Sequence, residues 1–263
     1  MTSNAPAEPL LRLRGISKHF GAVHALTNID LDLYSGAVTA LVGDNGAGKS
    51  VLIKCISGIY QPDAGELYWE GERVSVRTPR DAAALGIETV YQDLALCDNL
   101  DIVQNMFLGR EDTNGIVLDG ERMETAAQET LSSLAVTSVR SIRQHVASLS
   151  GGQRQSVAIA RAVLWNTKLV IMDEPTAALG VAQTAMVLAL VRRLAERGHA
   201  VLFISHNMID VFNVADRIAV LQLGRLVAAR PAAELDRQMV IELMTTGTTT
   251  RLAPPSPPAS GEG

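Results

Sequence analysis

Short, almost wholly apolar runs recur along the chain and alternate with stretches of helical periodicity. The runs occupy positions 38–42, 169–172, 200–204 and 218–221. Strands that are apolar at successive positions are buried on both faces, as in a parallel sheet. Between the runs, residues 154–164 and 181–196 place apolar residues three and four positions apart, which indicates amphipathic helices. This alternation predicts an α/β fold with a mostly parallel core sheet.

Two parts of the chain depart from this pattern. Residues 26–33 (LTNIDLDL) alternate between apolar and polar, which predicts a half-buried strand. From about 93 to 146 no strong strand run occurs, and residues 119–135 have the pattern of a helix that Asp119 caps. We therefore expect a helical insert, bounded at about 93 and 165, within a single domain. No repeat with a period of 20–50 residues is present.

Both ends of the sequence differ in composition from the middle. Residues 1–9 are mostly small and polar, and we expect them to form a flexible N-terminus. Residues 246–263 offer almost nothing to bury and contain four prolines, which predicts a disordered Pro-rich tail. Such a tail could dock in a proline-binding groove, although a solvated terminus is the simpler interpretation. The folded domain is therefore expected over residues 10–245.

The composition is that of a folded protein without an extreme charge. Of the 263 residues, 47% are hydrophobic and 19% are charged, and the formal net charge is −5. This acidic balance argues against a nucleic-acid partner. Two cysteines, Cys55 and Cys97, cannot form a disulfide framework, which indicates a reducing compartment. Because neither a membrane-spanning run nor a signal peptide is seen, work at a membrane would need a partner protein.

A glycine-rich segment follows the first apolar run and matches the pattern G-x-x-x-x-G-K-[ST]. It consists of Gly43, Asp44, Asn45, Gly46, Ala47, Gly48, Lys49 and Ser50. Glycines let the backbone turn tightly and direct N–H groups at phosphate oxygens, and the helix expected over 51–59 adds the positive end of its dipole. Lys49 is expected to bridge the β- and γ-phosphates, and the Ser50 hydroxyl is expected to ligate Mg²⁺. The segment predicts a nucleotide site.

A second acidic site follows the apolar run at 169–172. Asp173 and Glu174 end that run, where open α/β sheets bind their ligands. Asp173 is expected to hold Mg²⁺, and Glu174 to activate a water for attack on the γ-phosphate. An apolar run that ends in two acids is weak evidence for a functional site when taken alone. The phosphate loop upstream strengthens this interpretation.

The segment LSGGQ, twenty residues before Asp173, identifies a family. With the phosphate loop and the acid pair, it resembles the ATP-binding cassette (ABC) ATPases over residues 10–245. The resemblance implies a P-loop NTPase fold with an N-terminal antiparallel β region and a helical insert subdomain. Ser150 is expected to cap a helix, so that the helix start forms a second anion site with Gly151, Gly152 and Gln153. In the family, this site presses on the γ-phosphate of the partner in a head-to-tail dimer that encloses two ATP molecules.

Three further positions match the family pattern, and their roles are implied by the resemblance. Gln92 lies where the family has the glutamine that contacts Mg²⁺ or the attacking water. His206, which follows the run at 200–204, matches the switch histidine that contacts the γ-phosphate. Phe20 matches the aromatic residue that stacks on adenine. As isolated residues, each would more often be structural.

One position departs from the common family pattern. Where many members carry S-A-L-D after the acid pair, this sequence has A-A-L-G, so Gly180 replaces an aspartate that couples the two sites. No phosphate or Mg²⁺ ligand is lost by this change. The A-A-L-G form resembles the sugar-import branch.

Residues 90–100 (VYQDLALCDNL) and 105–111 (NMFLGRE) resemble ATPases of ribose-, xylose- and fructose-type importers, here in the single-cassette form. The resemblance implies an ATPase that uses ATP and Mg²⁺, forms a homodimer or pairs with a related ATPase subunit, and drives sugar uptake. It would sit at the cytoplasmic face of the cell membrane, bound to permease subunits through a groove near 92–100. A sugar-binding protein would be an indirect partner.

Three alternatives stay open. The chain could serve a transporter of another solute class, such as amino acids or lipids. It could be a non-transport cassette ATPase, although no coiled-coil insert, zinc cysteines or second cassette supports this. It could also be a degenerate regulatory cassette, which the complete set of phosphate and Mg²⁺ residues disfavours.

Overall fold

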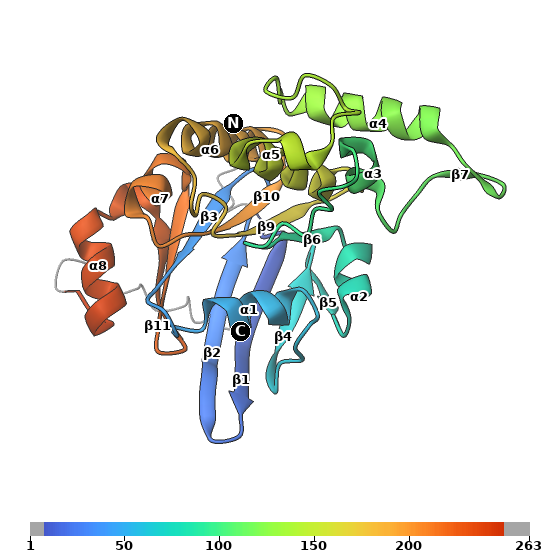
Figure 1. The fold of residues 1–263 in the computed structure, drawn as a ribbon. Helices are drawn as coiled ribbons and strands as arrows, with labels where there is room; N and C mark the ends of the chain where they lie inside the picture. Colours follow the sequence, from blue (N-terminus) through green and yellow to red (C-terminus); the bar gives the residue numbers. More distant parts are fainter. Residues whose placement is uncertain (1–7, 250–263) are drawn as a thin grey trace, which may run out of the picture.

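A six-stranded sheet forms the centre of the computed structural model, which describes residues 8–249 (Figure 1). The strand order is β12-β11-β3-β10-β9-β6, and only the edge strand β12 is antiparallel to its neighbour. The strands are β3 (Val38–Val42), β6 (Ile87–Val90), β9 (Leu169–Asp173), β10 (Ala200–Ile204), β11 (Arg217–Gln222) and β12 (Arg225–Pro231). The predicted α/β class with a mostly parallel core sheet is therefore confirmed.

Each central strand is buried on both faces, which explains why it is almost wholly apolar. In β3, Ala40 and Val42 pack into one hydrophobic core, whereas Leu41 packs into the other. The same division separates Met172 from Ile171 in β9. Successive side chains of a strand point to opposite faces, so two covered faces favour apolar residues at nearly every position. Thr39 in β3 is a buried polar exception.

An antiparallel sheet packs on one face of the central sheet and forms the predicted N-terminal β region. Its strand order is β2-β1-β4-β5. The strands are β1 (Leu11–Phe20), β2 (Val23–Leu33), β4 (Ala64–Trp69) and β5 (Glu72–Val74). The helix α1 (Lys49–Ile56) places its buried residues in the same core as these strands. Strand β2 contains the predicted segment 26–33 and begins three residues earlier, because it pairs with β1 up to Val23.

Helices cover the other face of the central sheet. The main ones are α5 (Gly151–Val163), α6 (Val181–Glu196), α7 (Met208–Val214) and α8 (Arg237–Thr246). The helix α2 (Pro79–Ala84) leads into β6, and single turns occur at η1 (Val146–Ser148) and η2 (Ala232–Glu234). Helix α6 has the bounds that its periodicity predicts.

The predicted insert extends from one end of this helical layer (Figure 1). It contains α3 (Ile102–Phe107), α4 (Gly120–Ser133) and a small hairpin of β7 (Thr113–Asn114) and β8 (Val117–Leu118). Asp119 caps α4 as expected, since its side chain accepts from the backbone N–H of Arg122. The hairpin was not expected, because two residues per strand leave no readable alternation.

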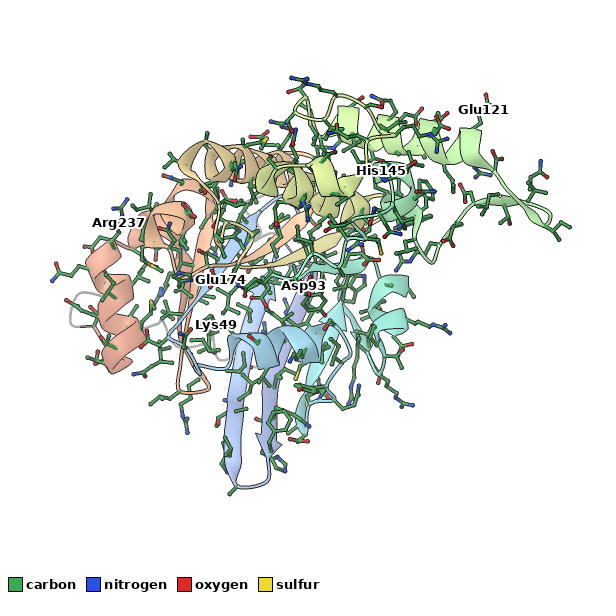
Figure 2. All side chains as sticks on the ribbon, viewed as in Figure 1. Lys49, Asp93, Glu121, His145, Glu174 and Arg237 are labelled. Carbon is green, nitrogen blue, oxygen red and sulfur yellow. The ribbon has the colours of Figure 1, made fainter. Side chains whose placement is uncertain are left out.

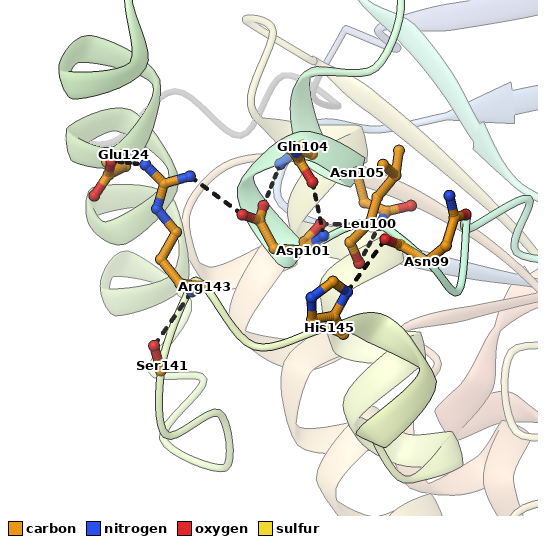
Figure 3. A network of polar contacts seen from close by, with 9 residues as sticks. All are labelled: Asn99, Leu100, Asp101, Gln104, Asn105, Glu124, Ser141, Arg143 and His145. Carbon is orange, nitrogen blue, oxygen red and sulfur yellow. Dashed lines mark hydrogen bonds and ion pairs between the residues drawn. The ribbon is translucent and has the colours of Figure 1, made fainter.

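Polar side chains hold the insert together (Figure 3). Arg143 joins Asp101 at the start of α3 to Glu124 on α4. The side chain of Asn105 is fully buried and bonds to the backbone of Cys97, Leu100 and Asp101. The loop before α3 is therefore shaped by a side chain from within the helix.

The far ends of the chain lie outside the described residues 8–249, and so does most of the predicted Pro-rich tail. Helix α8 ends at Thr246, where Gly247 adopts a left-handed conformation that terminates it. Between residues 8 and 249, no helix is long and apolar enough to cross a membrane.

Candidate functional site

A cavity of about 610 Å³ opens at the carboxyl ends of β3 and β9. It collects predicted residues from segments far apart in the sequence, and Lys49 and Glu174 approach each other across it (Figure 2). The predicted residues that line it are Asn45, Gly46, Gly48, Lys49, Ser50, Gln92, Asp173, Glu174 and His206. The tertiary structure thus brings together the phosphate loop, the acid pair, the glutamine and the histidine.

The phosphate loop depends on two glycines that no other residue could replace without strain. A Cβ at Gly43 would lie 2.3 Å from the Leu221 carbonyl oxygen, and one at Gly48 would lie 2.7 Å from that of Ala25. Gly48 also has φ of +106° and precedes α1 without any side-chain cap. The first N–H groups of α1 are therefore left for a ligand, as at an anion-binding helix terminus.

Gly43, Asp44 and Ala47 support the loop and do not line the cavity. The Lys49 ammonium donates to the carbonyl oxygens of Gly43 at 2.6 Å and Asp44 at 3.0 Å. Burial lowers the pKa of Lys49, while the carboxylates of Glu174, Asp173 and Asp44 act in the opposite direction. A phosphate group would give this desolvated cation a charged partner in place of two carbonyls.

The two acids make the cavity suitable for a divalent cation. Burial raises the pKa of Asp173, and the neighbouring Glu174 raises it further, whereas Lys49 opposes both. A cation beside Asp173 would relieve this cost, and the Ser50 hydroxyl and Gln92 amide supply further oxygen ligands. No cluster of three or more His, Cys, Asp or Glu that could hold a metal occurs among the described residues. Phosphate oxygens and water would be the remaining ligands of a cation held here.

Glu174 and His206 form a pair at the mouth of the cavity. His206 Nδ1 lies 2.9 Å from Glu174 Oε2, and the Glu174 side chain is 17% exposed against 73% for His206. The backbone N–H of Glu174 donates to the Ile204 carbonyl at 3.0 Å, which joins the ends of β9 and β10. Glu174 can therefore act as a base whose orientation a histidine controls.

Gln92 enters the cavity from the loop that follows β6. Just beyond it, the guanidinium of Arg161 donates to the carbonyls of Leu94 at 2.8 Å and Ala95 at 2.9 Å. Arg161 lies on α5, the helix that begins with the LSGGQ segment. The loop that carries Gln92 is thus tied to that helix, a link that the sequence alone did not reveal.

The LSGGQ segment lies outside the cavity. Ser150 caps α5 as predicted, because its hydroxyl accepts from the Gln153 N–H and the Gln153 side chain accepts from the Ser150 N–H at 2.8 Å. A Cβ at Gly152 would lie 2.8 Å from Met186, so this glycine lets α5 pack closely on α6. The role of Ser150, Gly151, Gly152 and Gln153 in binding a nucleotide stays a prediction.

Phe20 also lies outside the residues that line the cavity. Its ring packs against Tyr60 with centroids 5.2 Å apart, and it is 44% exposed. Val23 and His24 line the cavity from the same hairpin, and Leu223 and Gly224 line it from the turn between β11 and β12. The sequence does not predict these cavity residues, because Leu223-Gly224 is not one of the dipeptides that mark a tight hairpin turn.

Comparisons with known proteins agree with this geometry. The ABC transporter family profile matches residues 26–177. The chain is 48% identical to the xylose/arabinose import ATP-binding protein XylG of Sulfolobus acidocaldarius, over 90% of this chain and 94% of that one. It is 51% identical to the fructose import ATP-binding protein FrcA of Rhizobium meliloti, over 83% and 86%. It spans about half the length of the ribose import ATP-binding protein RbsA of Caldanaerobacter subterraneus, at 39% identity.

Solved structures share the fold. The ADP conformation of MJ1267, an ATP-binding cassette of an ABC transporter, superposes with a TM-score of 0.77 at 26% identity and covers 90% of this chain and 95% of that one. A dimeric cassette, MJ0796 bound to ADP and Pi in a post-hydrolysis state, superposes with a TM-score of 0.70 at 25% identity, over 84% and 98%. Together with the cavity and the profile match, these likenesses show that the chain belongs to the ABC transporter family, as one of its ATPases.

Proposed function

We propose that this chain is the ATPase subunit of a sugar importer and that it acts at the cytoplasmic face of a membrane. One observation carries the proposal: five residues of the phosphate loop share one cavity with the acid pair and the histidine, in a chain 48–51% identical to two sugar import ATP-binding proteins. Uptake of another solute class is the second candidate, because the permease and its binding protein, and not this subunit, would select the solute.

ATP would bind with its phosphates on the loop at 43–50 and the start of α1. Ser50, Asp173 and Gln92 would hold Mg²⁺, which when bound neutralises phosphate charge. Lys49 would leave its two carbonyl partners for the β- and γ-phosphates. Phe20 or the nearer Val23 and His24 would contact adenine, since that hairpin flanks the cavity.

Glu174 would accept a proton from the water that attacks the γ-phosphate. Its carboxylate is mostly shielded from solvent and is oriented by His206 at 2.9 Å, so its geometry suits a general base. His206 is exposed enough to contact the γ-phosphate as well. The chain's own residues thus supply the anion cradle, the base and the group that orients the base.

A second copy, or a related ATPase subunit, would complete each site. The start of α5, which would serve as a second anion site, does not reach the cavity of its own chain. A head-to-tail partner would bring its α5 against the γ-phosphate. The dimeric form of the MJ0796 cassette supports this arrangement.

A permease pair would dock where the insert meets the core. A cavity of about 230 Å³ lies there between β6, α3 and α5, and Glu88, Arg110 and Trp165 are among its lining residues. Arg161 also lines this cavity and donates to the carbonyls of the loop that follows Gln92. A permease segment seated there would therefore be linked to the nucleotide site through Arg161 and this loop. A sugar-binding protein would act on the far side of the permease.

The test is the ATPase activity of the full chain assembled with importer permeases and their binding proteins, which present monosaccharides, amino acids or no solute. We expect sugar to raise kcat at least about threefold and Glu174→Gln to lower it by about 10²-fold or more while ATP still binds. Stimulation by amino acids alone would support the second candidate. Full turnover in Glu174→Gln would remove the base role from Glu174.

A further inference from the structure

A buried hydrogen bond joins the two loops that carry Glu174 and His206. Thr176 Oγ1 donates to Asp210 Oδ2 at 2.7 Å, and the two residues are only 8% and 4% exposed. Thr176 lies two residues after Glu174, and Asp210 lies four residues after His206 in the first turn of α7. The bond therefore ties the segment that carries Glu174 to the segment that carries His206. Neither Thr176 nor Asp210 lines the nucleotide cavity.

The loop that carries Glu174 is held in a conformation that its residues do not favour. Glu174 has φ of +51° and Ala178 has φ of +60°, a region that non-glycine residues seldom adopt. Two turns fold the loop, with the Ala177 N–H on the Glu174 carbonyl and the Leu179 N–H on the Thr176 carbonyl. Strain of this kind persists only where the surroundings hold the backbone in place.

Two ties supply that support. In front of Thr176, the Glu174 N–H donates to the Ile204 carbonyl at 3.0 Å and fixes the end of β9. Behind Glu174, the Thr176 hydroxyl anchors the loop to α7, whose start Asn207 caps with its side chain. The Glu174–His206 contact lies between these ties, and a hydroxyl-to-carboxylate bond in a buried setting is the stronger kind of hydrogen bond.

We propose that Thr176 and Asp210 are positioning residues for ATP hydrolysis: their hydrogen bond keeps the Glu174 carboxylate against His206. The inference rests on the proposed role of Glu174 as base. Loss of the bond releases the loop, and a general base displaced by about 1 Å can lose as much as 10²-fold in rate. Neither residue lines the nucleotide cavity, so ATP affinity stays as it is.

The test compares substitutions that remove the bond with substitutions that keep it. Single-turnover hydrolysis is measured with the full chain in excess over Mg·ATP, and the Kd for ATP is measured separately. We expect Thr176→Val and Asp210→Ala each to slow hydrolysis at least about tenfold, with Kd within about twofold of the unaltered chain. Thr176→Ser keeps the hydroxyl and Asp210→Asn keeps an acceptor oxygen, so both should restore most of the rate. The double change Thr176→Val/Asp210→Ala should be no slower than the worse single change.

Thr167 provides a matched control at the other end of β9. It is 5% exposed, and its hydroxyl donates to the Ala162 carbonyl. Thr167→Val therefore removes a comparable buried bond, so it should lower the melting temperature as Thr176→Val does but leave the hydrolysis rate unchanged. An equal loss of rate in both valine variants, or a Thr176→Ser rate as low as that of Thr176→Val, would overturn the positioning role.

The Glu174→Gln variant separates the two proposals. If Glu174→Gln is inactive and Thr176→Val hydrolyses at the normal rate, the positioning role fails alone. If Glu174→Gln turns over normally, the base role fails first and the positioning role fails with it.

Discussion

The phosphate loop and the helical insert hold their shapes in different ways. In the loop, backbone groups make the contacts that fix the shape. The Lys49 ammonium bonds to the carbonyls of Gly43 and Asp44, and Gly43 fits against Leu221 only because it lacks a Cβ. In the insert, side-chain hydrogen bonds fix the shape, as those of Asn105 and Arg143 show (Figure 3). A shape made by consecutive residues is readable as a motif, whereas a shape made by side chains from distant segments is not.

The largest effect is expected from breaking the insert at Asn105. Asn105→Ala leaves the Cys97 N–H without its partner and opens a gap at a fully buried position. The carbonyls of Cys97 and Leu100 also lose the amide, but each keeps a backbone N–H donor. A polar group left without a partner costs about 1–3 kcal/mol and the gap adds to this cost, so we expect the free energy of unfolding to fall by about 3 kcal/mol. Urea unfolding measures this.

Asn99 serves as the control for that change. Only its backbone carbonyl takes part in the network, where it contacts His145, so Asn99→Ala should change stability by less than about 0.5 kcal/mol. Binding of ATP should survive in Asn105→Ala, since Asn105 does not line the cavity. An Asn105→Ala protein as stable as the unaltered chain would contradict the role given to this side chain.

The phosphate loop should respond in the opposite way to loss of Lys49. Lys49→Ala removes the cation expected on the phosphates, and a charged hydrogen bond is worth about 1.5–3 kcal/mol. We therefore expect ATP affinity to fall about 10- to 100-fold while the unfolding transition stays close to normal. Titration calorimetry with ATP would measure the first, and urea unfolding the second.

Lys54 on the same helix is a suitable control for Lys49. Its ammonium lies over the Tyr60 ring, 5.3 Å from the centroid, and outside the cavity. Lys54→Ala should bind ATP within about twofold of the unaltered chain. Equal losses in the two variants would mean that general charge, and not the position of Lys49, governs binding.

A smaller effect is expected from the pH dependence of Cys55, which packs beneath the phosphate loop on α1. Burial raises the pKa of the Cys55 thiol to about 11, above the usual value of about 8.5 for an unfolded chain. The folded chain thus holds this proton where the unfolded chain loses it, so the stability due to Cys55 is complete below about pH 8.5 and falls as pH rises toward 11. We expect the unaltered chain to lose about 1–2 kcal/mol more than Cys55→Ala between pH 8 and 10.5, measured by urea unfolding. Parallel pH profiles of the two proteins would show that the thiol has the same pKa in the folded and unfolded chains and would contradict the effect of burial.

Much of the core and the cavity was predictable from the sequence. Strands buried on both faces are apolar at nearly every position, so the apolar runs predict β3 and β10 with their observed bounds. The phosphate loop, Asp173 and Glu174 were found because each follows such a strand, and the carboxyl ends of parallel strands meet at one edge. Ser150 is predictable as a cap because the LSGGQ segment leads directly into a helical run, and the structure adds the reciprocal bond to Gln153.

Other features were hidden because their partners are remote in sequence. Arg161 lies more than sixty residues from the carbonyls of Leu94 and Ala95 that it holds. Thr176 and Asp210 are 34 residues apart, and nothing in their neighbours marks either one. The cavity residues Leu223 and Gly224 come from a hairpin at the far edge of the sheet, which approaches the phosphate loop only after folding.

The amino-acid sequence by itself determined the core strands, the phosphate loop and the family, since these depend on consecutive residues and on backbone freedom at glycines. Only the tertiary structure decided how Glu174 meets His206, which loop Arg161 holds, and that the start of α5 stays outside the cavity of its own chain. The physical reason is the distance along the sequence between interacting residues. Backbone geometry is set within a few residues, whereas hydrogen bonds between loops depend on which strands the sheet places side by side.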